Sequence, residues 1–251
     1  MIPALLLGRK GSIGFPGKNT IEVLGRKLAE YPIIHAQNSK YIDKIYLSTD
    51  DPKLMELSKK HEIEIIERPE YLCTNEALGE DAFKHGYEVI KERNKNENID
   101  LIILLFCNAV TFLAKHIDEG IEALMSDQAL DSAVTVSQYN WYSPVRARKI
   151  GPNGTLEPFI PFENYPQELT IDCDRNSQGD VYFADVCVSV VKSNCLENLN
   201  YGVLPQKWMG RKIFPILNWG GLDVDKEWQL PLVVYWLKKH GFSNRKFPYK
   251  Q

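Results

Sequence analysis

Short apolar runs without internal alternation separate longer amphipathic stretches along the first two-thirds of the chain. In Ile102–Leu105, for example, four aliphatic residues follow one another, which is typical of a strand buried on both faces. Amphipathic stretches between such runs predict helices that cover a parallel sheet on both sides. We therefore expect a three-layer α/β/α protein with a mostly parallel, Rossmann-like sheet, with strands at 2–7, 44–48, 62–67, 101–106 and 132–137 and helices at 27–39, 52–61, 79–95 and 114–130.

The carboxyl ends of these strands are the expected place for a ligand. Open parallel sheets bind their ligands just beyond those ends. This rule selects the loops that follow Leu7, Ser48, Glu67 and Phe106 before any motif is considered.

The pattern becomes irregular between residues 139 and 180, where five prolines interrupt it. A long irregular excursion from a domain is usually functional or an oligomer contact. Regular patterns return with strands at 181–191 and 213–216 and an amphipathic helix at 226–239. Because the sequence contains no internal repeat or linker-like segment, we expect a single domain over residues 1–251 that carries this excursion.

Composition excludes several classes of protein. The net charge of −3 argues against a general nucleic-acid binder. The five cysteines are odd in number and form no C-x-x-C pair, so neither a disulfide framework nor a zinc site is indicated. The longest apolar runs are far shorter than the roughly 20 residues of a membrane span, and the start of the chain lacks the features of a signal peptide. We expect a soluble, cytoplasmic protein without a membrane partner.

A basic, glycine-rich segment follows the first predicted strand at residues 8–19, Gly-Arg-Lys-Gly-Ser-Ile-Gly-Phe-Pro-Gly-Lys-Asn. Glycines allow several backbone N–H groups to point at one position, and the basic side chains add full charges, so the segment suits a polyphosphate. It matches neither the P-loop pattern nor the dinucleotide pattern G-x-G-x-x-G. Taken alone, a flexible loop that is basic by chance explains it equally well.

Two acidic pairs are candidates for chemistry or for helix capping. Asp223 and Asp225 have the spacing that places both carboxyl groups on one side of an extended segment, and two hard oxygen ligands suit Mg²⁺. The alternative is that Asp225 caps a helix that begins at the next residue. For Asp50 and Asp51 a structural role is favoured, with Asp51 as the cap of a helix.

The segment 9–19 resembles the signature R-x-G-S-K-G-x-P-x-K-N of the CMP-sialic acid synthetases, a family of sugar-activating cytidylyltransferases. Further matches follow in the family's order: Leu47–Asp51, then Arg68-Pro69-x-x-Leu72, and finally Asp223-Val-Asp225. The matches span residues 5 to 230. Four weak matches in the right order, at predicted strand ends, favour the phosphate-binding interpretation of the loop.

The resemblance implies a fold, a reaction and a set of residues. It implies that a 3-deoxy-2-ulosonic acid attacks the α-phosphate of CTP, releasing pyrophosphate, with one or two Mg²⁺ ions as cofactor. It also implies a homodimer in which the excursion at 139–180 reaches the partner subunit. The implied catalytic residues are Lys18, Arg9 and Asp225, and the implied metal ligands are Asp223 and Asp225. The implied nucleotide-binding residues are Gly8, Arg9, Lys10, Gly11, Ser12, Lys18, Asn19 and Arg68.

The sequence departs from the family mainly around the expected sugar pocket. Ile13 stands where the family has a lysine, Asn75 replaces an acid, and Phe106 and Phe112 stand where the family has Gln and Arg. We therefore expect a sugar pocket that differs from one for N-acetylneuraminate, and as substrate a modified or different ulosonate: a nonulosonic acid (sialic-, legionaminic- or pseudaminic-like) or a related 3-deoxyulosonic acid. The candidate sugar contacts are Asn108, Asp180 and Arg175, with Arg146, Arg148 and Arg211 as further candidates for its carboxylate.

Two other interpretations stay open. A Kdo or 8-amino-Kdo cytidylyltransferase, or another sugar nucleotidyltransferase of the same fold, would share most of these features. The departures at Ile13 and Phe106 also allow a non-catalytic protein that binds a nucleotide or a sugar.

Overall fold

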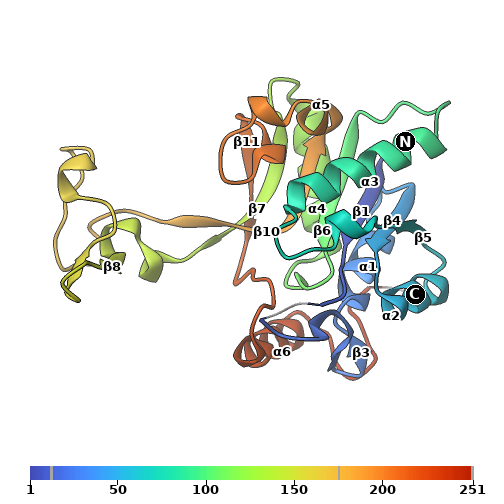
Figure 1. Cartoon of the computed structure of the whole chain (residues 1–251), viewed down its shortest axis with the longest axis horizontal. Helices are drawn as coiled ribbons and strands as arrows, with labels where there is room; N and C mark the ends of the chain where they lie inside the picture. The colour runs from blue at the N-terminus through green and yellow to red at the C-terminus, as the bar shows by residue number, and fades with distance from the viewer. Residues whose placement is uncertain (12–13, 175, 250–251) are drawn as a thin grey trace.

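Seven strands form one central sheet in the computed structural model, which describes residues 1–11, 14–174 and 176–249 (Figure 1). The strand order is β11-β7-β10-β6-β1-β4-β5. β10 pairs antiparallel with β6 and β7, and the other neighbours pair in parallel, so the predicted α/β class with a mostly parallel sheet is confirmed. The strands are β1 (Pro3–Leu7), β4 (Lys44–Thr49), β5 (Glu64–Glu67), β6 (Leu101–Phe106), β7 (Ser132–Gln138), β10 (Tyr182–Lys192) and β11 (Ile213–Asn218).

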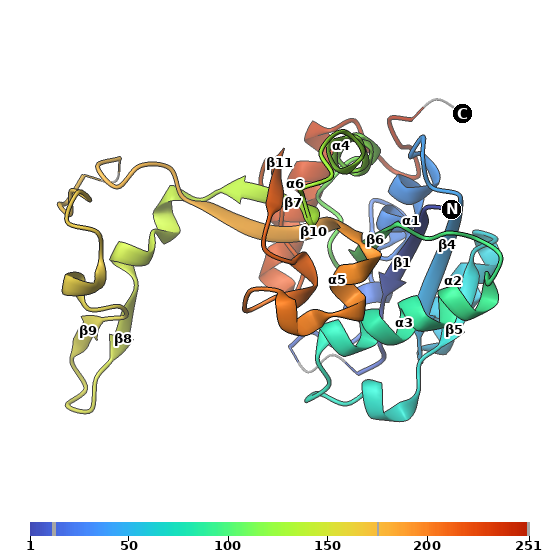
Figure 2. The same cartoon turned by 90° about the horizontal axis from the view of Figure 1, so that it is seen from above.

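Helices cover both faces of this sheet (Figure 2). On one face, α1, α2 and α4 pack on a core that includes Leu6 of β1; on the other, α3 and α5 pack on a core that includes the neighbouring Leu5. Successive side chains of a strand point to opposite faces, so a strand between two helical layers is apolar at every position. The helices are α1 (Glu30–Gln37), α2 (Pro52–Lys60), α3 (Gly79–Arg93), α4 (Ala114–Ser126), α5 (Ser193–Glu197) and α6 (Leu230–Lys239).

The ends of some elements differ from the prediction for local reasons. The prediction that helix α1 begins at residue 27 is wrong, because residues 22–27 form the hairpin of β2 (Glu22–Val23) and β3 (Arg26–Lys27). Its turn uses Leu24 at φ +48° and Gly25 at φ +75°, the positive values that a tight two-residue hairpin requires. The predicted cap of α2 is confirmed, since the side chain of Asp51 accepts a hydrogen bond from the backbone N–H of Lys53.

The irregular excursion is an arm of residues 139–181 that connects β7 to β10 and extends away from the body of the protein (Figures 1 and 2). It contains the small hairpin of β8 (Arg148–Ile150) and β9 (Leu156–Pro158). Large apolar side chains lie exposed on it, among them Trp141, Tyr142, Ile150, Leu156 and Phe159.

No helix in the described parts of the chain combines the length and the apolar character that crossing a bilayer requires.

Candidate functional site

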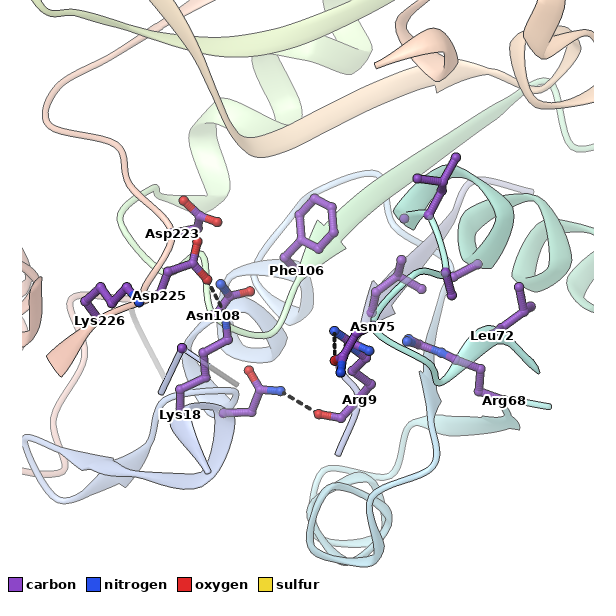
Figure 3. A pocket seen from close by; sticks show the side chains of 18 residues that line it. Arg9, Lys18, Arg68, Leu72, Asn75, Phe106, Asn108, Asp223, Asp225 and Lys226 are labelled. Carbon is purple, nitrogen blue, oxygen red and sulfur yellow. Dashed lines mark hydrogen bonds and ion pairs between the residues drawn. The ribbon is translucent and has the colours of Figure 1, made fainter. Parts of the chain in front are cut away.

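A cavity of about 580 Å³ opens at the carboxyl ends of β1, β5 and β6. Its walls come from the glycine-rich loop, the segment between β5 and α3, the end of β6 and the segment 223–226 (Figure 3). Three of the four loops selected by the strand-end rule therefore line it, those after Leu7, Glu67 and Phe106. Asp51, in the loop after β4, lines a neighbouring pocket with Arg9, Lys10 and Lys18.

An acidic pair and a lysine form one end of this cavity. The ammonium of Lys18 forms an ion pair with the carboxyl group of Asp225, and Asp223 lies next to it (Figure 3). The alternative role of Asp225 as a helix cap is wrong, because Lys226 occupies the cap position of the turn Glu227–Gln229. The backbone N–H groups of Asp225 and Lys226 donate to Oε1 of Gln229 at 2.7 Å, and the Asp225 side chain pairs with Lys18.

Burial raises the pKa of Asp223, and the nearby charge of Asp225 raises it further, while Lys18 acts in the opposite direction. Two adjacent carboxyl groups in a partly desolvated place repel each other, so a cation there is favourable. No cluster of three or more His, Cys, Asp or Glu side chains suited to a metal occurs among residues 1–11, 14–174 and 176–249. The pair fits Mg²⁺, which characteristically takes one or two protein carboxylates and completes its shell with phosphate and water.

The backbone around the acidic pair is tied to the end of β6. Asn108 and Val224 exchange hydrogen bonds: the Val224 N–H donates to the backbone carbonyl of Asn108 at 3.0 Å, and Nδ2 of Asn108 donates to the Val224 carbonyl at 3.1 Å. Asn108 is buried and lines the cavity. Its amide nitrogen is thus engaged in holding the segment that carries the acids.

Arg9 faces the opposite wall. Its guanidinium donates to the carbonyls of Cys73, at 3.0 Å, and Thr74, and to Oδ1 of Asn75 at 3.1 Å. These bonds hold the loop after β5 against the glycine-rich loop. Asn75, at the position of the family's acid, thus contacts a predicted phosphate-binding residue.

The glycine-rich loop has both packed and open positions. Gly8 is tightly packed, since a Cβ there would lie 2.6 Å from Leu54 and 2.7 Å from Cys107. Gly11 has a φ of +83° with open space around it. The backbone N–H of Lys10 donates to Oδ1 of Asp50 at 2.8 Å, which anchors the loop to the end of β4.

Arg68 and Asn19 are the members of the predicted nucleotide set with buried polar side chains. Nε and Nη2 of Arg68 donate to the hydroxyl and the carbonyl of Ser48 at 3.2 and 2.7 Å, and burial lowers the pKa of its guanidinium. Nδ2 of Asn19 lies 3.4 Å from the carbonyl of Arg9, and within the described residues its buried Oδ1 has no hydrogen-bond partner. Both side chains line the cavity.

Some predicted residues are not brought to the cavity. Asp180, at the base of the arm, accepts hydrogen bonds from Gln138 and Asn140 and does not line it. Arg146, Arg148 and Arg211 donate to backbone carbonyls elsewhere. Phe112 is fully buried in the core, so an arginine at its position would not face a ligand. Ser12 and Arg175 lie outside the described residues.

Sequence reasoning missed several residues that line the cavity. Leu78, Gly79 and Ala82, from the start of α3, form part of its apolar wall with Leu72 and Phe106. The available signal was the predicted helix start at Gly79, directly after a strand-end loop. Gly14 was also missed; a Cβ there would lie 2.9 Å from the carbonyl of Asp225, so the glycine permits the loop to approach the acids.

Comparison with known proteins gives consistent results. A family model described as cytidylyltransferase matches residues 3–148. A bifunctional pseudaminic acid cytidylyltransferase and hydrolase from Helicobacter pylori is 26% identical over 145 residues, which cover 57% of this chain and 27% of that protein. An N-acylneuraminate cytidylyltransferase from Escherichia coli is 22% identical over 185 residues, which cover 73% of this chain and 42% of that protein. The matched region spans less than half the length of either relative.

Among solved structures, a CMP:2-keto-3-deoxy-manno-octonic acid synthetase in complex with CTP superposes with a TM-score of 0.65 at 14% sequence identity. The superposition covers 95% of this chain and 98% of that one. At this level of identity the likeness concerns the fold.

The raised pKa of Asp223 generates a prediction about stability and pH. The folded protein favours the protonated form of Asp223, so in metal-free buffer its contribution becomes unfavourable as pH rises from the ordinary aspartate value of about 3.9 towards the raised value. Asp223→Asn removes this penalty. We expect the variant to match the wild type near pH 4 and to be more stable at pH 7, in denaturant unfolding with EDTA present.

The control for this experiment is Glu119→Gln, which neutralises an exposed carboxyl group on α4. It should show no such pH-dependent gain. A constant difference between Asp223→Asn and the wild type over this pH range would contradict the assignment.

Proposed function

The chain belongs to the cytidylyltransferase family, and from this premise we propose that it forms a CMP-sugar from CTP and a nonulosonic or related 3-deoxyulosonic acid, releasing pyrophosphate. The observation that carries the proposal is the arrangement of one cavity: the Lys18–Asp225 ion pair with Asp223 at one end, and Arg9 and Arg68 on the opposite wall. A polyphosphate needs cations on several sides, and a divalent metal needs the acids.

We propose a separate role in phosphoryl transfer for each of the residues around the cavity. The anomeric hydroxyl of the sugar would attack the α-phosphorus of CTP, the α–β bridging oxygen would leave with pyrophosphate, and the hydroxyl proton would pass to solvent or a neighbouring base. Such reactions depend on positioning and on stabilisation of charge. Lys18 is held at the edge of the cavity by Asp225, where it would stabilise charge on the α-phosphate. Arg9 would bind the outgoing phosphates.

Asp223 and Asp225 would hold Mg²⁺, which would offset the charge of the triphosphate when bound. The proposal that the base is cytosine is supported by Arg68. Because Ser48 fixes two of its guanidinium nitrogens, Arg68 presents a rigid donor edge to the cavity, suited to the carbonyl and ring nitrogen of cytosine.

The sugar is proposed to be of the pseudaminic or legionaminic kind. Phe106 packs edge-to-face on Phe83, with ring centroids 5.1 Å apart, and Phe83 packs in the same way on Trp208 at 5.4 Å. This stack gives the cavity a rigid apolar wall, with the neutral amides of Asn75 and Asn108 beside it. Such a wall suits methyl and acyl groups better than a chain of hydroxyl groups. The name of the Helicobacter pylori relative agrees with this choice.

A Kdo-type enzyme is the second candidate, and it rests on the likeness of fold to the octonic acid synthetase. Incubation with CTP, Mg²⁺ and each of sialic, legionaminic, pseudaminic, Kdo and amino-Kdo acids, with pyrophosphate release as the readout, decides between them. Absence of turnover with every acid, together with turnover of another nucleoside triphosphate, would contradict the proposal.

Lys18→Ala tests catalysis. We expect kcat to fall by about 10² to 10³, the cost of removing one charge-stabilising group, while CTP affinity from calorimetry changes by only a few-fold. The matched control is Lys40→Ala, which removes an exposed lysine that does not line the cavity; it should keep full activity. Equal loss of CTP affinity and of turnover in Lys18→Ala would instead favour a role for Lys18 in binding the ground state.

Phe106→Gln tests the choice of sugar. Restoring the family's glutamine adds a hydrogen-bonding group to the wall, so the kcat/KM ratio of pseudaminic to N-acetylneuraminic acid should fall by about tenfold, within the usual range for one such contact. Phe106→Leu is the matched control, because it keeps the wall apolar and should keep the preference. An unchanged ratio in Phe106→Gln would place the sugar elsewhere in the cavity.

We also propose that the arm mediates a homodimer, because its exposed apolar side chains favour a partner surface. Leu156→Asp on the β8–β9 hairpin should convert a dimer into a monomer in light scattering coupled to size-exclusion chromatography. Leu204→Asp is the matched control, since Leu204 is about as exposed (78% against 74%) but lies outside the arm. A wild-type protein that is monomeric at micromolar concentration would refute the proposal.

A further inference from the structure

The segment 219–224, which precedes Asp225 and carries Asp223, is held by the core although most of it has no regular secondary structure. The Gly221 N–H donates to Oγ of Ser137 at 2.9 Å, and the hydroxyl of Tyr139 donates to the Gly221 carbonyl at 3.0 Å. The Leu222 N–H donates to Oγ1 of Thr111 at 2.8 Å. Each bond joins the segment to a residue more than 80 positions away in sequence, at the end of β7 or in the connection between β6 and α4, so the segment has a fixed path.

A buried carboxyl group lies beneath this segment. Asp185 is 8% exposed and accepts hydrogen bonds from three donors: Oγ of Ser137 at 2.6 Å, Nδ2 of Asn218 at 3.1 Å and the backbone N–H of Cys187 at 3.1 Å. Ser137 in turn accepts from Gly221, and Oδ1 of Asn218 accepts from the N–H of Trp219 at 2.9 Å. Asp185 therefore orients Ser137 and Asn218, the two side chains that accept hydrogen bonds from the start of the segment.

The backbone around Asp185 is distorted in a way that keeps its carboxyl group in this place. β10 pairs with β7 up to Ala184 and resumes pairing at Ser189, with a bulge between. In this bulge Val186 has a φ of +48°, which is unfavourable for a β-branched residue. Backbone outliers of this kind are concentrated at functional sites, where the surroundings maintain them. Gly221 completes the fit, because a Cβ there would lie 1.9 Å from Oδ2 of Asp185.

From this geometry we infer that Asp185 is a positioning residue, which acts through Ser137 and Asn218 to fix the two carboxyl groups of Asp223 and Asp225 as a divalent-cation site. The inference rests on the proposed function for the identity of the ligand, a metal–nucleotide complex. Residues that orient metal ligands commonly change metal affinity by 10- to 100-fold when they are replaced. A purely structural carboxyl group would change stability without that effect.

Asp185→Asn is the test variant. All three partners of Asp185 donate to it, and an asparagine accepts through one oxygen only, so its amide nitrogen must face at least one donor. The matched control is Asp131→Asn. Asp131, like Asp185, accepts several hydrogen bonds. It receives the backbone N–H groups of Arg211 and Lys212 at 2.8 and 2.9 Å, at the ends of β7 and β11 opposite the cavity.

Two readouts are measured on the full chain. The first is the Kd of Mn²⁺ in the presence of CTP, from electron paramagnetic resonance; the second is hydrogen exchange at the amides of Gly221 and Leu222 without metal. We expect Asp185→Asn to raise the Kd for Mn²⁺ by about tenfold or more and to speed exchange at these amides. Asp131→Asn should do neither. CTP affinity without metal should stay within a few-fold of wild type in both variants.

The outcomes separate this inference from the proposed function. A Mn²⁺ Kd in Asp185→Asn within about twofold of wild type, or an equal weakening by Asp131→Asn, overturns the inference. If wild-type protein with CTP binds no Mn²⁺, the proposed function fails, and unchanged exchange at Gly221 and Leu222 would then overturn the positioning role separately.

A second pair of variants covers the case in which Asp185→Asn does not fold. Thr111→Val leaves the N–H of Leu222 without its acceptor, while Thr111→Ser keeps the hydroxyl. If the held segment positions the acids, Thr111→Val should weaken Mn²⁺ binding in the same way, and Thr111→Ser should retain wild-type affinity. Equal affinity in the two variants overturns the inference.

Discussion

Burial of β1 and β6 on both faces is the constraint on which the rest of the structure depends. Leu5, Leu6, Ile103 and Leu105 are fully buried, and these two strands pair in parallel at the centre of the sheet. Parallel pairing requires a crossover between strands, which places helices on both faces and the carboxyl ends of the parallel strands at one edge. The glycine-rich loop, Asn108 and the loop after β5 meet at that edge for this reason. The cavity is thus a consequence of how the apolar runs are buried.

Much of the fold could be predicted from the sequence because its signals are local. A strand buried on both faces is an uninterrupted apolar run, and the observed ends of the central strands lie within two residues of those predicted. Asp51 before a proline marked the start of α2 equally well. The hairpin at 22–27 could not be predicted in this way, because it depends on contact with the distant end of the chain: the Arg245 N–H donates to the carbonyl of Leu24 at 3.0 Å.

The candidate site was predictable in its membership and less so in its geometry. Arg9, Lys18, Arg68, Asn108 and the two acids follow strand ends or precede the last helix, so the fold alone brings them to one edge. The hydrogen-bond partners of each side chain could not be predicted. Arg68 donates to Ser48, and Thr111 holds Leu222, yet no periodicity or motif relates residues 20 or 111 positions apart. Such contacts depend on the order of the strands in the sheet and on how the loops pack, and the sequence pattern does not encode either.

The antiparallel direction of β10 explains why the arm and the acidic pair are connected. β10 is antiparallel to both β6 and β7, so β7 runs in the same direction as β6 and the arm leaves the sheet at its ligand-binding edge. Because β10 runs in the opposite direction, the arm also re-enters at that edge, with Tyr182 paired to Gln138. Side chains at both ends of the arm can then hold the segment that carries Asp223. Tyr139 bonds to it directly, and Asp185 acts on it through Ser137 and Asn218. With β10 parallel, the returning stem would enter at the far edge, and the carboxyl group of Asp185 could not lie beneath Gly221.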